Sequence, residues 1–65
     1  MKDEQIKREL GLLEEYKKMA KENNDIKQWH QLCTVIRHWK EYSKEIRDNI
    51  LDCVAKHATC RYKEN

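Results

Sequence analysis

The sequence has 65 residues, of which 38% are hydrophobic and 40% are charged, and its 14 basic and 12 acidic side chains leave a formal net charge of +2. This length allows one domain, residues 1–65, with a small core, and the near balance of charge argues against a nucleic-acid binder. No apolar run approaches the ~18 residues that cross a membrane, and the charged start "MKDEQIKREL" lacks the apolar part of a secretory signal. We therefore expect a cytoplasmic protein with reduced cysteines.

The first predicted element is a helix over about residues 3–22. The chain has no Pro, one Gly and many Glu, Lys and Leu residues, which favour helix almost everywhere. One face of this helix is apolar and contains Ile6, Leu10, Leu13, Tyr16 and Ala20. The loop 23–25 is the one clear break, because Asn adopts the left-handed conformation that ends helices and Asp25 is a good N-cap. A connection this short predicts a helical hairpin.

The second predicted helix spans about residues 26–61. Steps of three and four define an apolar seam typical of a coiled coil, formed by Trp29, Leu32, Ile36, Trp39, Ser43, Ile46, Ile50, Cys53, His57 and Cys60. The seam continues through the middle of the chain, and residues 37–47 contain no strong helix breaker. We therefore predict one continuous helix. The alternative is a closed three-helix bundle that turns near Ser43 or Asp48.

A continuous second helix would need a partner chain. At 1.5 Å per residue the first helix is about 30 Å long and the second about 55 Å, so the first covers only half of the second. The uncovered apolar side chains predict a second copy. The expected fold is therefore all-α, a hairpin that pairs antiparallel into a four-helix homodimer. Its predicted interface contains Trp39, Ser43, Ile46, Ile50, Leu51, Cys53 and Val54.

A surface of mixed charge lies beside the seam. A basic stripe runs beside the seam, and an acidic stripe lies next to it. A surface with both signs of charge fits a protein partner better than a nucleic acid. Arg and Tyr are favoured anchors in such patches. The predicted partner contacts are Arg37, His38, Lys40, Tyr42, Lys44 and Arg47. The alternative interpretation is a solvated face stabilised by ion pairs four residues apart.

Three cysteine and histidine residues raise the question of a zinc site. Cys53, His57 and Cys60 follow one another at steps of four and three, and Cys and His are the natural zinc ligands. The pattern lacks the tight spacing of a zinc knuckle, and free Cys is commonly a small buried apolar side chain. We therefore expect the protein to fold without metal and to use no cofactor.

The sequence shows none of the motifs of an enzyme. It has no Gly-rich phosphate loop and no nucleophile turn, so we expect no catalysis and no small-molecule substrate. The expected function is to bind a larger protein and to inhibit or adapt it, and the chain looks like the small inhibitors carried by phages and mobile elements. In size and helical pattern the hairpin is similar to small plasmid-encoded proteins that dimerise and bind paired RNA loops. That similarity implies an RNA-binding dimer as the alternative function. The third interpretation, which comes from the Cys and His spacing, is a zinc-stabilised helical module.

Overall fold

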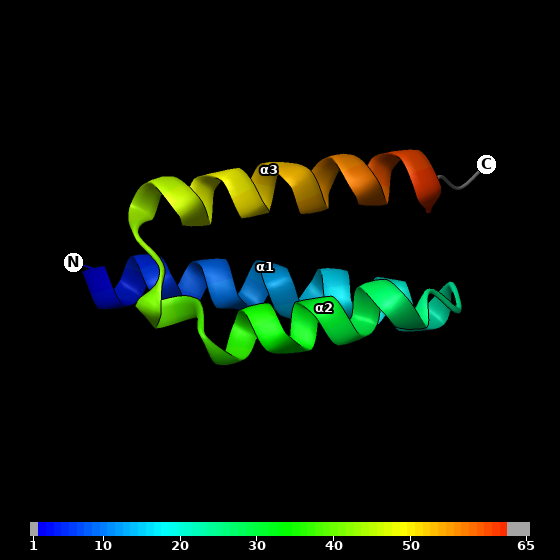
Figure 1. Ribbon diagram of the computed structural model, residues 1–65, viewed down its shortest axis with the longest axis horizontal. Helices are drawn as coiled ribbons and strands as arrows, with labels where there is room; N and C mark the ends of the chain where they lie inside the picture. Colours follow the sequence, from blue (N-terminus) through cyan, green and yellow to red (C-terminus); the bar gives the residue numbers. More distant parts are fainter. Residues whose placement is uncertain (1, 63–65) are drawn as a thin grey trace.

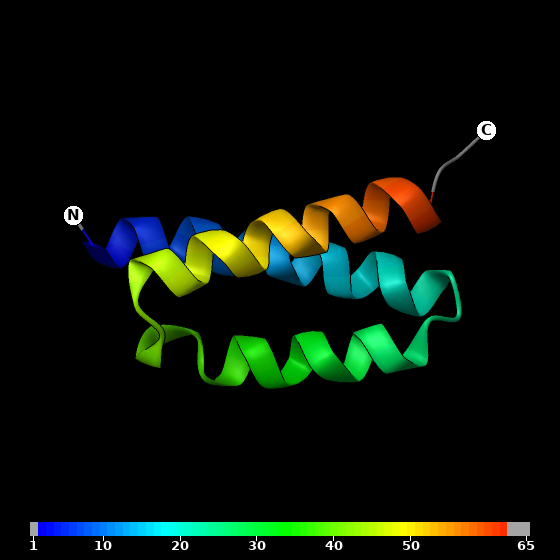
Figure 2. The same ribbon diagram turned by 45° about the horizontal axis from the view of Figure 1, so that its top comes forward.

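Three α-helices lie side by side along the length of the molecule (Figures 1 and 2). The computed structural model describes residues 2–62. Its elements in chain order are α1 (Lys2–Glu22), α2 (Ile26–Arg37), the 3-10 turn η1 (Trp39–Glu41) and α3 (Lys44–Arg61). Figure 1 shows that α1 and α3 run in the same direction and α2 in the opposite one. Residues 2–62 contain no strand, so the all-α prediction is confirmed.

The turn between α1 and α2 forms where the sequence predicts it. Asn24 has a left-handed backbone with φ of 61°, which ends α1. The carboxylate of Asp25 accepts a hydrogen bond from the backbone N–H of Gln28 at 3.4 Å. This bond caps the N-terminus of α2, so the predicted roles of the two residues are confirmed.

The predicted continuous helix over 26–61 is wrong, because the chain turns back between His38 and Ser43. The helical bonds of α2 end at His38, whose N–H donates to the carbonyl of Thr34 at 3.2 Å. After η1, Tyr42 is extended, and the Ser43 hydroxyl accepts a hydrogen bond from the N–H of Ile46 at 3.4 Å. Ser43 is therefore the N-cap of a new helix. The three-helix alternative is compatible with this arrangement.

The core lies between the helices and is built around a fully buried Trp39. Leu13 of α1, Leu32 of α2 and Val54 of α3 pack with it in one cluster, and Leu51 lies against the cluster. The face of α3 that packs in the core thus contains residues 51, 54 and 58. Each of them lies one position after a predicted seam residue, namely 50, 53 and 57. Trp39, Leu51 and Val54, predicted at a dimer interface, serve the core of a single chain instead.

Candidate protein-interaction surface

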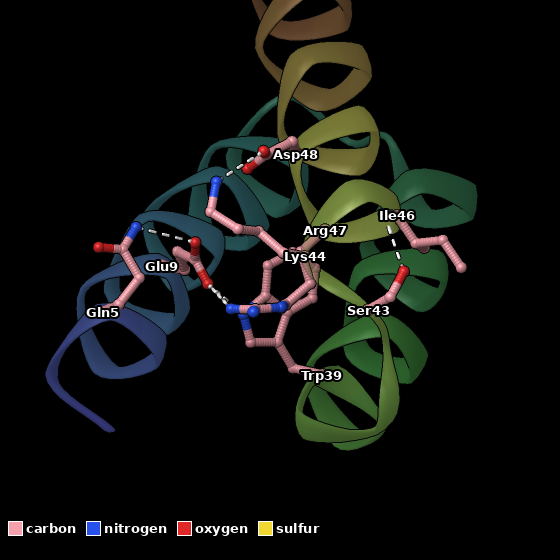
Figure 3. A network of polar contacts seen from close by, with 8 residues as sticks. All are labelled: Gln5, Glu9, Trp39, Ser43, Lys44, Ile46, Arg47 and Asp48. Atoms are coloured by element: carbon pink, nitrogen blue, oxygen red, sulfur yellow. Dashed lines mark hydrogen bonds and ion pairs between the residues drawn. The ribbon is translucent and has the colours of Figure 1, made fainter. Parts of the chain in front are cut away.

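A buried polar cluster joins α1 to η1 and α3 (Figure 3). Glu9 is only 3% exposed, and its Oε1 accepts hydrogen bonds from Trp39 Nε1 at 3.1 Å and from Arg47 Nη1 at 2.6 Å. Its other oxygen, Oε2, accepts from Gln5 Nε2 at 3.1 Å. A buried carboxylate is tolerated because all these donors face it. Glu9 thereby fixes the point at which the chain turns back.

The same cluster sets the charge state of Glu9. Burial alone raises the pKa of this carboxyl group, because it disfavours the charged form. The hydrogen bonds from Gln5, Trp39 and Arg47, together with the charge of Arg47, outweigh burial, and the net pKa lies below its ordinary value. Glu9 is therefore an anion that neutralises Arg47.

Four of the six predicted partner contacts line one hollow at the turn between η1 and α3. The hollow measures about 530 Å³, and its walls are Gln5, Ile6, Lys40, Tyr42, Ser43, Lys44 and Arg47. The hollow therefore lies where the N-terminal half of α1 meets η1 and the first turn of α3. The other two predicted contacts, Arg37 and His38, do not line it, and His38 lies 3.4 Å from the carboxylate of Glu41.

The three cations of this hollow differ in how far they are already paired. The Arg47 side chain is 12% exposed and bound to Glu9, so it is not the free contact that the sequence suggested. Its buried Nε has no hydrogen-bond partner among residues 2–62. Lys44 pairs with Asp48 at 3.1 Å, but both side chains are exposed, which makes the pair weak. Lys40 is exposed and forms no ion pair within the described part of the chain.

A second hollow is a groove of about 380 Å³ between α2 and α3. One wall is formed by Gln28, Gln31, Leu32 and Val35 of α2, and the other by Asn49, Ile50, Cys53, Val54 and His57 of α3. None of these residues is Lys, Arg, Asp or Glu, in a chain in which 40% of residues are charged. The groove is therefore a largely apolar surface with amide groups along it.

The remaining predicted interface residues lie on α3 and at its N-cap. Ile46 is 47% exposed, and Ser43 and Cys53 are exposed too, while Ile50 is half-buried. The structure thus separates the predicted interface into residues of the core, against which Ile50 also packs, and an exposed group of Ser43, Ile46 and Cys53. Ser43, which the sequence placed at the centre of a seam, caps α3 instead.

A second polar cluster connects the loop between α1 and α2 to the end of α3. Asp25 Oδ2 lies 2.9 Å from His57 Nε2 and accepts a hydrogen bond from the Tyr62 hydroxyl at 2.7 Å. The bonds from His57 and Tyr62 lower the pKa of Asp25 to about 2. Burial and the bond to Asp25 raise the pKa of Tyr62 to about 12. The three side chains hold the ends of α2 and α3 together.

The predicted metal residues are not gathered into a site within residues 2–62. No group of three or more His, Cys, Asp or Glu side chains in this part of the chain is placed to hold a metal ion. Cys53 and Cys60 are exposed, and His57 is engaged with Asp25.

Sequence reasoning missed the roles of Glu9 and Tyr62. Glu9 lies three residues after Ile6 and four before Leu13, on the apolar face of α1, and a carboxylate at such a position signals a buried partner. Tyr62 gave no comparable signal, because its partner Asp25 is 37 residues away.

The chain was compared with known proteins at three levels. No protein-family model, no curated protein and no solved structure matches it. Among residues 2–62, no helix is long and apolar enough to cross a membrane.

Proposed function

We propose that this chain is a small non-enzymatic protein that binds a larger protein and inhibits or adapts it. The observation that supports the proposal is the hollow that contains Lys40, Tyr42, Lys44 and Arg47. It combines an aromatic ring, an apolar side chain from Ile6 and three cations, which is the composition of binding hot spots. A partner segment that carries carboxylates and an apolar anchor would complement it.

The charges of the hollow favour a protein over RNA as the partner. RNA binding draws on cations that are free to neutralise phosphates. Arg47 is already neutralised by Glu9, and Lys44 has Asp48 beside it, so Lys40 is the one cation of the hollow without an ion pair inside residues 2–62. RNA binding stays the alternative, and its affinity for generic RNA would fall steeply as salt rises.

We also propose that the protein works as a homodimer, for a reason that differs from the one the sequence suggested. α3 is not left alone, because it packs on α1. The exposed Ile46, Cys53 and Cys60 nevertheless form an uncovered surface on α3. The zinc-stabilised module has no supporting observation in the described residues.

The test is affinity capture from the native host with a charge-reversed hollow. Lys40→Glu with Lys44→Glu changes two exposed side chains of the hollow and no core residue. The matched control, Lys18→Glu with Lys27→Glu, makes the same change in net charge at exposed positions outside the hollow. We expect the first variant to lose the captured protein and the control to retain it. Equal capture by both variants would contradict the proposal.

A further inference from the structure

The hollow at the turn between η1 and α3 has an excess of one positive charge. Its three cations are Lys40, Lys44 and Arg47, and the side chains that line it include no carboxylate. The carboxylate of Glu9 pairs with Arg47. The carboxylate of Asp48 pairs with Lys44. One positive charge is therefore left over, and it fits an occupant that brings a single negative charge.

The two ion pairs differ in how readily an incoming anion can open them. Glu9 and Arg47 are both largely buried, so their contact belongs to the interior. The Lys44 and Asp48 side chains are 72% and 55% exposed, and they meet at 3.1 Å (Figure 3). An exposed pair of this kind contributes little to stability, because water and salt screen it. The ammonium group of Lys44 can therefore exchange one carboxylate for another at small cost.

We propose that Asp48 holds Lys44 in the free protein and that an acidic side chain of the partner displaces it. The occupant is an Asp or Glu side chain of a protein segment, which bonds to the ammonium groups of Lys40 and Lys44. An apolar neighbour in the same segment lies on Ile6 and Tyr42. A hollow of about 530 Å³ is large enough for both side chains. This inference rests on the proposed function and adds the chemistry of the partner and a residue that tunes the affinity.

The apolar walls of the hollow explain why the acidic residue needs an apolar neighbour. Ile6 and Tyr42 are half-buried and pack against the core. The Tyr42 ring meets the Trp39 ring edge to face, with 6.1 Å between the ring centroids. Side chains held in this way lose little entropy when a partner covers them, so their contact adds affinity. The lysines then select for charge, and the apolar walls supply most of the affinity.

A carboxylate fits the hollow better than a phosphate group. A phosphate ester carries about −1.5 to −2 charges at pH 7, which exceeds the positive charge left over. Phosphate is also bound best by the free fork of an arginine. Arg47 donates from Nη1 to Glu9, and its Nε is buried without a partner among residues 2–62, so only Nη2 is left to reach an occupant. The anion is therefore met mainly by the lysine ammonium groups.

Peptide selection tests the chemistry of the occupant. A library of short random peptides is selected on the wild-type protein and depleted on the Lys40→Glu with Lys44→Glu variant. We expect the retained peptides to carry Asp or Glu beside a large apolar residue. They are then synthesised with acetylated and amidated ends, so that acidic side chains supply the only carboxylates. Replacing the acidic residue with its amide should weaken binding about three- to tenfold, since it removes the charge that two exposed lysines attract.

Asp48→Asn tests the exchange itself. It leaves Lys44 without its internal partner and should tighten peptide binding about two- to fivefold, the range that an exposed ion pair is worth. The matched control is Asp52→Asn, which breaks a similar exposed pair with Lys56, formed at 3.2 Å outside the hollow. Its change in net charge is the same, and at physiological salt a charge about 12 Å along the helix from Lys44 is screened. Equal tightening by both variants would overturn the exchange.

The outcomes separate the chemistry of the partner from the proposed function. If the wild type retains no class of peptide that the charge-reversed variant loses, the acidic occupant is wrong. If a phosphoserine peptide binds more tightly than the matching Glu peptide, the hollow belongs to a phosphorylated partner, and the assignment of a single carboxylate is contradicted. Neither result bears on capture of a larger protein from the native host, which tests the proposed function on its own.

Discussion

Trp39 donates its indole N–H to the carboxylate of Glu9, 30 positions earlier in the chain, at 3.1 Å. The same carboxylate oxygen accepts from Arg47 at 2.6 Å, so one buried side chain of α1 holds both ends of the segment in which the chain reverses (Figure 3). This arrangement also fixes the hollow proposed as the partner site, since Arg47 is one of its walls. Stability and the shape of the proposed partner site therefore depend on the same cluster.

The Glu9–Arg47 pair should behave as one unit when it is mutated. Arg47→Met leaves a buried carboxylate without its counter-ion and should reduce the free energy of unfolding by about 3–5 kcal/mol. Glu9→Leu with Arg47→Met removes both charges. The exposed Gln5 amide can bond to water instead, so the buried Trp39 N–H is the donor left unpaired, at a cost of about 1–3 kcal/mol. Urea unfolding followed by circular dichroism measures both. If the double variant is no more stable than Arg47→Met alone, the two residues are not coupled as proposed.

Stability should fall in acid because of Asp25. The pKa of this carboxyl group is lowered from 3.8 to about 2 in the folded chain, so the folded state favours the charged form. Its stabilising effect is complete well above pH 3.8 and is lost as the pH falls towards about 2. Denaturant unfolding at a series of pH values measures this loss. The Asp25→Asn variant should show a flatter acid limb, and an identical limb in both proteins would contradict the assignment.

Gly11 offers a stabilising change that should leave every site intact. It lies inside α1, and a Cβ atom added there would meet nothing within 4 Å. Gly costs a helix interior about 0.5–1 kcal/mol relative to Ala, so Gly11→Ala should raise the free energy of unfolding by that amount. Thermal unfolding should show a higher midpoint. A lower midpoint would mean that a partner approaches this face in the folded protein, for instance in the homodimer.

The sequence was sufficient to predict the features that depend on neighbouring residues. The first helix, the left-handed Asn and the Asp25 cap follow from residues within a few positions of one another. The reversal at 38–43 does not, because no Gly or Pro marks it and the apolar spacing continues across it. Ser43 was the available signal, since it is the one hydroxyl within that apolar spacing and a favoured N-cap residue.

The break forms because contacts with α1 stabilise it. Folding back buries Val54 in the core and brings Arg47 to Glu9, 38 residues away. Periodicity along one segment does not reveal gains of this kind, which arise between segments far apart in the chain. For the same reason periodicity did not reveal that Arg47, one of the predicted partner contacts, is paired with a carboxylate on another helix.

The reversal of the chain is the central claim, and one distance tests it. Spin labels at Lys27→Cys and Arg61→Cys, with the three native cysteines replaced, would report the separation of two exposed positions by double electron–electron resonance. Mixing the labelled protein with an excess of unlabelled protein ensures that the measured distances lie within one chain and not between two copies. Because Asp25 bonds Tyr62 at 2.7 Å, we predict labels that lie close together at one end of the bundle. A continuous helix between these two positions would instead separate the labels by about 50 Å. A measured label-to-label distance of that size would contradict the three-helix fold and the sites that depend on it.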